Sequence, residues 1–174
     1  MRKKKWNYWC VYGEDILFSA TISHLDYAAV CFVYFLEYET QRYFEKTVLI
    51  PLGTKVKMST QVLETVSFAN SELRIHMSHF DGDTHLSVIC PDFDGEHLQA
   101  ELTIHHPAAD DSLNVVIPWN RQTFQFTAKH HTLPTTGTVK IGNRRYTFNE
   151  EESYSVLDYG RGIWPREATW NWGM

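Results

Sequence analysis

The chain has 174 residues, of which 43% are hydrophobic, and its formal net charge is −5 at pH 7. The acidic balance argues against nucleic acid as a partner, because nucleic-acid backbones bind clustered Lys and Arg side chains. No stretch reaches the roughly 18–20 apolar residues that span a bilayer, so we expect no membrane span.

The first feature in chain order is a short basic run, residues 2–5. The segment that follows it lacks an uninterrupted apolar stretch and reaches Glu14 and Asp15 too soon for a secretory signal. We therefore expect no export signal and a cytoplasmic location.

Aromatic and β-branched residues alternate with polar ones along almost the whole chain, whereas apolar spacings of three and four are hard to find. This pattern predicts an all-β fold. The expected strands are 6–13, 15–24, 28–38, 42–50, 62–69, 72–79, 84–90, 97–105, 113–118, 123–130, 137–142, 144–149 and 153–158.

Several of these strands have one apolar and one polar face. Residues 97–105 are an example, with Leu98, Ala100, Leu102 and Ile104 on one side. Such strands, joined by Gly- and Asp-containing turns, form an antiparallel sheet that must curl or stack to bury its apolar face. The pattern leaves barrel and sandwich open, and no linker divides the chain, so we expect a single β domain over residues 1–174.

Two residue types that often carry chemistry point to core and surface roles here. Cys10, Cys31 and Cys90 have no CxxC spacing and lie within expected strands, which predicts reduced core thiols. The adjacent histidine pairs 105–106 and 130–131 lack the tight spacing of zinc motifs. Neighbouring strand residues face opposite sides, so at most one of each pair can face a common centre. We expect no metal site.

The strongest candidate site is near the end of the sequence, in LDYGRGIWPREATWNW. Asp158 ends an expected strand, and two glycines bracket Arg161, which suggests a backbone that presents one guanidinium to a ligand or to Asp158 itself. The alternative is a structural Asp–Arg pair that fastens the turn. The expected wall or lid consists of Trp164, Trp170 and Trp172.

Lys129 is a lesser candidate. It shares the polar face of its strand with Gln125 and Thr127, and a polar face that turns into a barrel interior would line a cavity. A solvated surface lysine is the alternative.

Three segments together resemble a known family. They are KKWNYWCVYGEDILFSATISHLDYAAV, LNVVIPWNRQTFQFTAKHHTLPTTGTV and the Trp-rich motif already quoted. In order and spacing they resemble the family called domain of unknown function 2804. Its members are about twice this length, and the Trp-rich motif falls near their middle. The resemblance implies that this chain is an amino-terminal half whose tryptophans form a junction with later strands.

That family is in turn similar to paired lipocalin-like barrels, the architecture of carotenoid hydratases, which handle apolar ligands. The resemblance implies an antiparallel lipocalin-like barrel or strongly curved sheet, one half of a two-barrel protein. In those hydratases an acidic residue and a histidine act without a cofactor. Carried over, this makes Asp158 the candidate acid, and no histidine partner aligns with it.

These observations favour binding of a small, largely apolar molecule, without a cofactor, in a pocket anchored by Asp158 and Arg161. If the protein is an enzyme, we expect a lyase, hydratase or isomerase that uses Asp158 as acid or base. The alternative is a carbohydrate-binding or purely structural β domain, with aromatic platforms such as Trp6 or Trp9. Exposed strand edges also suggest a homodimer.

Overall fold

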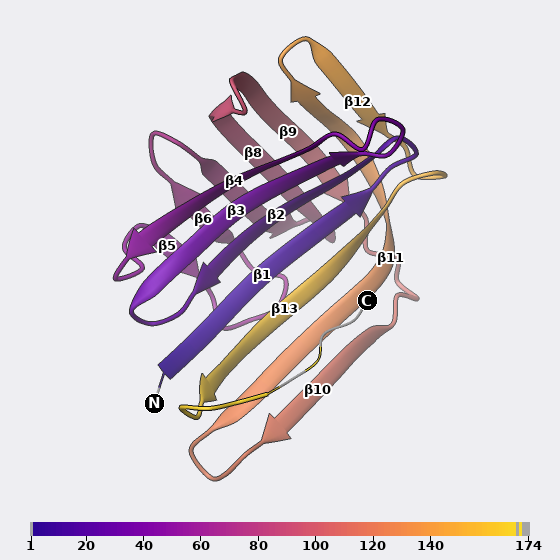
Figure 1. Cartoon of the computed structure of the whole chain (residues 1–174). Coiled ribbons are helices and arrows are strands. Elements are labelled where there is room, and N and C mark those ends of the chain that lie inside the picture. Colours follow the sequence, from indigo (N-terminus) through magenta and orange to yellow (C-terminus); the bar gives the residue numbers. More distant parts are fainter. Residues whose placement is uncertain (1, 170, 172–174) are drawn as a thin grey trace.

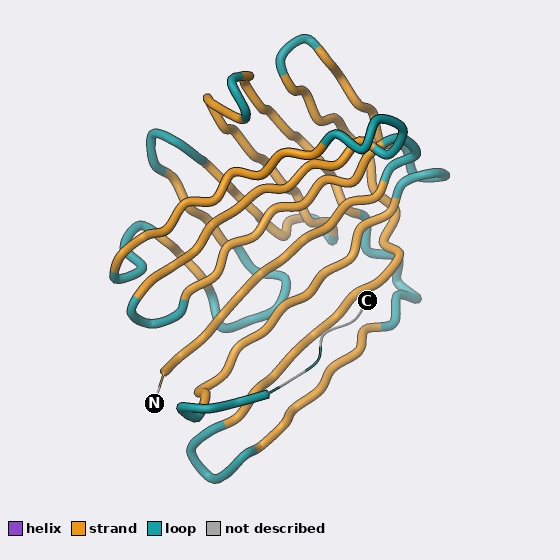
Figure 2. Tube along the Cα trace, viewed as in Figure 1, coloured by secondary structure: helices purple, strands orange, loops and turns teal. Residues whose placement is uncertain are grey.

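The computed structural model describes residues 2–169 and 171, and within them every regular element is a β-strand (Figure 2). The strands are β1 (Arg2–Tyr12), β2 (Ile16–His24), β3 (Ala28–Glu37), β4 (Tyr43–Pro51), β5 (Val56–Met58), β6 (Val66–Ala69), β7 (Arg74–Phe80), β8 (Asp83–Phe93), β9 (Glu96–Ile104), β10 (Ser112–Pro118), β11 (Phe124–Ile141), β12 (Arg144–Phe148) and β13 (Tyr154–Trp164).

All paired strands are antiparallel, and they form one sheet in the order β4-β3-β2-β1-β13-β11-β9-β8-β7-β6-β5. The long strand β11 joins its two halves. Its first part pairs with β13 and β10, and its last part pairs with β9 and β12. Between these parts the register shifts from His130 to Leu133, and Thr132 has a φ of 60°. Such an irregularity bends a strand, so β11 can serve both halves.

The two halves of the sheet lie over one another as layers, with β1–β4, β13, β11 and β10 in front in Figure 1 and β5–β9 behind. The layers contact each other through β2 with β5, β6 and β7, and through β4 with β8. Alternate residues of each strand point into the space between the layers. From the front layer these include Trp9, Phe18 and Phe35, and from the rear layer Phe68 and Met77.

This arrangement confirms the prediction of an all-β antiparallel fold and identifies it as a strongly curved sheet, a half barrel. The strand order ends at β4 on one side and at β5 on the other. The sequence pattern did not predict β5, and it divided β11 into two strands, because the irregular segment between His130 and Leu133 interrupts the alternation. Strand β13 also runs six residues beyond its expected end at Asp158, through the Gly-Arg-Gly segment.

The interior of the half barrel is filled by side chains. A cavity of only about 10 Å³ is found there, lined by residues that include Asn7, Trp9 and Met77. The sequence predicts a ligand pocket inside the barrel. The packed side chains of the described residues leave no room for a ligand there. A partly open cavity of greater volume lies on the opposite face of the front layer.

Cys10, Cys31 and Cys90 are buried and unpaired by disulfides, as the prediction of reduced core thiols requires. Burial raises the pKa of the Cys31 thiol to about 12. Among residues 2–169 and 171, no helix is long and apolar enough to cross a membrane.

Candidate functional site

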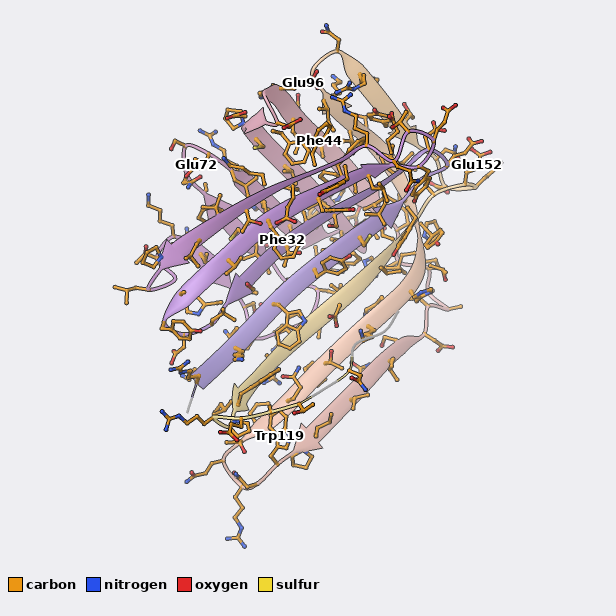
Figure 3. All side chains as sticks on the ribbon, viewed as in Figure 1. Phe32, Phe44, Glu72, Glu96, Trp119 and Glu152 are labelled. Carbon is orange, nitrogen blue, oxygen red and sulfur yellow. The ribbon has the colours of Figure 1, made fainter. Side chains whose placement is uncertain are left out.

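A cavity of about 260 Å³ lies on the outer face of the front layer, the face turned away from the core. Its floor comes from β1, β13 and β11, and its side from β10 and the turn after it. The lining residues are Trp6, Ile117, Trp119, Gln125, Thr127, Lys129, Asp158, Trp164, Thr169 and Asn171. We call this cavity the indole pocket. Figure 3 labels Trp119, which lies at the turn of the β10–β11 hairpin.

The floor of the indole pocket follows from strand register. Trp6 is paired with Gly160 across β1 and β13, and Lys129 is paired with Asp158 across β11 and β13. Residues paired in register lie on the same face, and so do residues two apart along a strand. The outer face of three neighbouring strands therefore gathers Trp6, Lys129 and Asp158 at one place.

Asp158 is the polar centre of the floor and is only 6% exposed. Its Oδ1 lies 3.3 Å from Nζ of Lys129, and this oxygen also accepts a hydrogen bond of 3.3 Å from the Thr127 hydroxyl. Its Oδ2 accepts a hydrogen bond of 3.2 Å from the Trp6 indole nitrogen. Both carboxylate oxygens thus have donors, as a buried charge requires.

Tyr8 lies next to this centre, because it is paired with Asp158 across β1 and β13. Burial raises the pKa of its hydroxyl far above the usual range, and the neighbouring Cys10 raises it further. The Tyr8 hydroxyl therefore stays neutral at physiological pH and adds no charge beside the ion pair.

The wall of the indole pocket is aromatic. The ring of Trp164 packs edge-on against Trp6, at 6.1 Å between centroids, and against Trp119 at 5.7 Å. Its indole nitrogen donates a hydrogen bond of 2.7 Å to Oε1 of Gln125, and the ammonium of Lys4 lies 4.1 Å from its ring centroid. Hydrogen bonding, edge contacts and a cation–π contact together fix the orientation of this ring.

The two glycines of the Gly-Arg-Gly segment make room for the aromatic side chains and for a neighbouring strand. A Cβ on Gly160 would overlap the indole of Trp6, whose six-membered ring occupies that volume. A Cβ on Gly162 would overlap the carbonyl oxygen of Phe124 and approach the indole nitrogen of Trp164 to 3.0 Å. Both positions therefore need glycine because another group occupies the side-chain volume.

The structure separates Asp158 from Arg161, the two members of the predicted pair. They are three residues apart on one strand, so their side chains point to opposite faces of the sheet. The Arg161 guanidinium lies on the inner face, 5.2 Å from the ring centroid of Phe126 and 5.9 Å from that of Phe124. Lys129, the lesser candidate in the sequence, is the cation beside Asp158 instead.

Of the three predicted wall residues, the structure places Trp164 in the indole pocket, where it is 5% exposed. Trp170 and Trp172 lie outside the described residues. Trp119 and Thr127 belong to the pocket although the sequence analysis did not select them as site residues. The alternation that places Lys129 on the polar face of β11 also places Thr127 there, and this was the signal available in the sequence.

Comparisons with known proteins agree with this description. A profile of the family described as domain of unknown function (DUF2804) matches residues 1–174. Curated proteins give no match. A crystal structure from Nitrosomonas europaea, of a protein described as a candidate AttH, superimposes with a TM-score of 0.68 at 8% identity. The alignment covers 96% of this chain and 53% of that protein, so the chain spans about half its length. At this identity the likeness shows the fold alone.

Proposed function

The chain belongs to the family of the domain of unknown function 2804, and we propose that its half barrel binds a small, largely apolar molecule in the indole pocket. The observation that carries the proposal is the joint presence of a partly open cavity, aromatic walls and a buried polar centre. Small-molecule sites typically combine a mostly apolar lining with a few convergent polar groups.

The dimensions of the indole pocket limit the ligand. Its volume of about 260 Å³ lies just below the range of about 300–1,000 Å³ for ligand sites, so the ligand must be small. The rings of Trp6, Trp119 and Trp164 offer edges and faces to a flat apolar body. Lys129, held by Asp158, offers an ammonium donor to one polar group on the same molecule. We infer a ligand with a flat hydrocarbon body and one hydrogen-bonding head.

Binding is better supported than catalysis by Asp158. Both of its oxygens already accept hydrogen bonds or pair with a cation, through Trp6, Thr127 and Lys129. A general acid or base needs an oxygen directed at the substrate, within hydrogen-bond reach of the proton that moves. This arrangement supports an anchoring role for Asp158, and cofactor-free lyase, hydratase or isomerase chemistry is the lesser proposal.

A two-unit architecture is part of the same proposal. Because the chain spans about half of the Nitrosomonas protein, we propose that this half barrel is one of two lipocalin-like units. Strand β10 pairs only with β11 among the described strands and exposes Leu113, Val116 and Ile117. For the 174-residue chain on its own, we propose that the open edge of β10 pairs with a second copy of the chain. Unpaired apolar strand edges favour the addition of another strand.

A neutral apolar fluorophore, N-phenyl-1-naphthylamine, tests the binding proposal. We expect saturable binding of one molecule per chain, with energy transfer from tryptophan. Trp119→Ala removes a rim indole that is 39% exposed, so the fold should persist while the affinity falls at least about tenfold. Phe80→Ala is the matched control, because it removes an exposed ring on β7, away from the indole pocket.

Two outcomes would contradict this proposal. One is the absence of saturable binding to the folded protein. The other is an equal loss of affinity in the Trp119 and Phe80 variants. Retention on a polysaccharide column that Trp6→Ala abolishes, together with no fluorophore binding, would instead favour the carbohydrate-binding alternative.

A further inference from the structure

A second cluster of chemistry-bearing side chains lies on the inner face, at the point where β11 bends. His106 follows the end of β9, Asp110 belongs to the loop before β10, and His130 is on β11 just before the irregularity. One ligand atom from each of the three lies within 4.8 Å of the others. The cluster shares no residue with the indole pocket.

From this geometry we propose that His106, Asp110 and His130 bind one divalent transition-metal ion of the zinc class. Two imidazoles and a carboxylate are a donor set that zinc prefers, and three protein ligands leave a fourth position for water or substrate. Tetrahedral bonds of about 2.0–2.1 Å require donor atoms about 3.3 Å apart. The widest separation must therefore shrink by no more than about 1.5 Å, which side-chain rotation can supply.

The backbone brings these ligands together by a turn and a strand pairing. In the loop after β9, the amide of Asp110 donates a hydrogen bond of 2.9 Å to the carbonyl of Pro107, which folds the loop back on itself. The amide of His105 donates to the carbonyl of Pro134 at 2.9 Å, and this bond fixes the start of the loop beside β11. His106 and Asp110 are thereby held opposite His130.

The cluster is also oriented and shielded as metal ligands usually are. Nδ1 of His130 lies 2.7 Å from Oδ2 of Asp110, and the two side chains are 12% and 14% exposed. Nε2 of His106 lies 2.9 Å from the Thr84 hydroxyl, and its ring packs edge-on against the core ring of Trp9, with 6.1 Å between centroids. Thr84 and Trp9, which lie behind His106, fix the plane of its ring, and Asp110 orients His130 from within the cluster.

The adjacent histidines behave differently, which supplies matched controls. His105 turns away to Asp83, with Nδ1 2.9 Å from Oδ2, and to Glu150. His131 is exposed and follows His130 on the opposite face of β11. Only one histidine of each sequence pair therefore faces the cluster. The sequence did not predict a metal site, because His130 lies on a strand well separated in sequence from the loop that carries His106 and Asp110.

The test is calorimetric titration of the untagged full chain with zinc chloride after treatment with a chelator. We expect one equivalent of zinc to bind, and cobalt to give the visible absorption bands of a tetrahedral site. His130→Asn should weaken binding more than about 100-fold, since loss of even an outer-shell partner costs about 10–100-fold. His131→Asn should keep the affinity within about threefold.

Folding is monitored in parallel by circular dichroism. If the His130→Asn variant does not fold, Asp110→Asn is measured instead. Asp110 lies in a loop, and the asparagine oxygen still accepts a hydrogen bond, so we expect this variant to fold. The proposal is overturned if the folded wild-type chain binds no zinc stoichiometrically. It is equally overturned if the affinity of the folded His130 or Asp110 variant matches wild type, or if His131→Asn loses as much.

Discussion

The ion pair on the floor of the indole pocket makes the most quantitative prediction, for the substitution Asp158→Asn. The side chains of Lys129 and Asp158 are 22% and 9% exposed. Asparagine is nearly isosteric, but its single amide oxygen can accept from only one of Trp6 and Thr127, which donate to different oxygens of Asp158. The main change is the loss of the carboxylate charge beside the Lys129 ammonium. Breaking a buried pair costs about 3–5 kcal/mol, and partial exposure of Lys129 favours the lower end, about 3 kcal/mol.

Urea denaturation at pH 7, followed by tryptophan fluorescence, measures this loss. For a domain of this size, about 3 kcal/mol corresponds to a fall in melting temperature of about 6–12 °C. Lys129→Met removes the cation, and the double variant should be more stable than the sum of the single losses predicts, by at least about 2 kcal/mol. A loss below about 1 kcal/mol for Asp158→Asn, typical of an exposed pair, would refute the claim that this centre is desolvated.

Three further predictions concern other parts of the fold. Gly160→Ala should destabilise the protein by about 1–3 kcal/mol, because the new methyl group displaces the Trp6 ring; an unchanged urea midpoint would contradict this. Burial and a hydrogen bond to Glu37 raise the pKa of Tyr146 to about 12, so its contribution to stability is complete below pH 10 and is lost between pH 10 and 12. Tyr146→Phe should remove that part of the pH dependence of the unfolding free energy. A pH profile identical to that of the wild type would show that the Tyr146 hydroxyl makes no such contribution. Cys31, whose buried thiol also has a pKa of about 12, should react with a thiol reagent only after unfolding. Labelling of Cys31 in the native protein, located by peptide mass spectrometry, would show that the thiol is accessible.

Much of the fold was predictable because alternation with a period of two is a local property of the sequence. Strands such as β9, with Leu98 and Ile104 on one face, have this pattern throughout, and the structure confirms them. The bend in β11 was not predictable, because residues 131–136 break the alternation and resemble a loop. Only tertiary pairing, with β13 before the bend and β9 after it, shows that the strand continues.

The candidate site was predictable in part for the same reason. The aromatic and acidic residues of the last motif predicted a site near the end of the sequence, and Asp158 and Trp164 both line the indole pocket. Their role in binding stays a prediction. The pairing of Asp158 with Arg161 assumed that the strand ended at Asp158. Because β13 continues to Trp164, alternation places the two side chains on opposite faces. The cation that lies beside Asp158 is Lys129, from a strand about thirty residues earlier. The sequence pattern could not show this, because the register between strands is not a local property.

The central claim, that an apolar molecule binds on the outer face of the sheet, is tested most directly by ¹⁹F NMR of the protein labelled with 5-fluorotryptophan. Single Trp→Phe variants assign the resonances, and N-phenyl-1-naphthylamine is then titrated in. We predict saturable shifts for Trp6, Trp119 and Trp164, with no shift for Trp9, which is 1% exposed in the core between the layers. Shifts at Trp9 with unchanged resonances for the other three would place the ligand inside the half barrel and contradict the account.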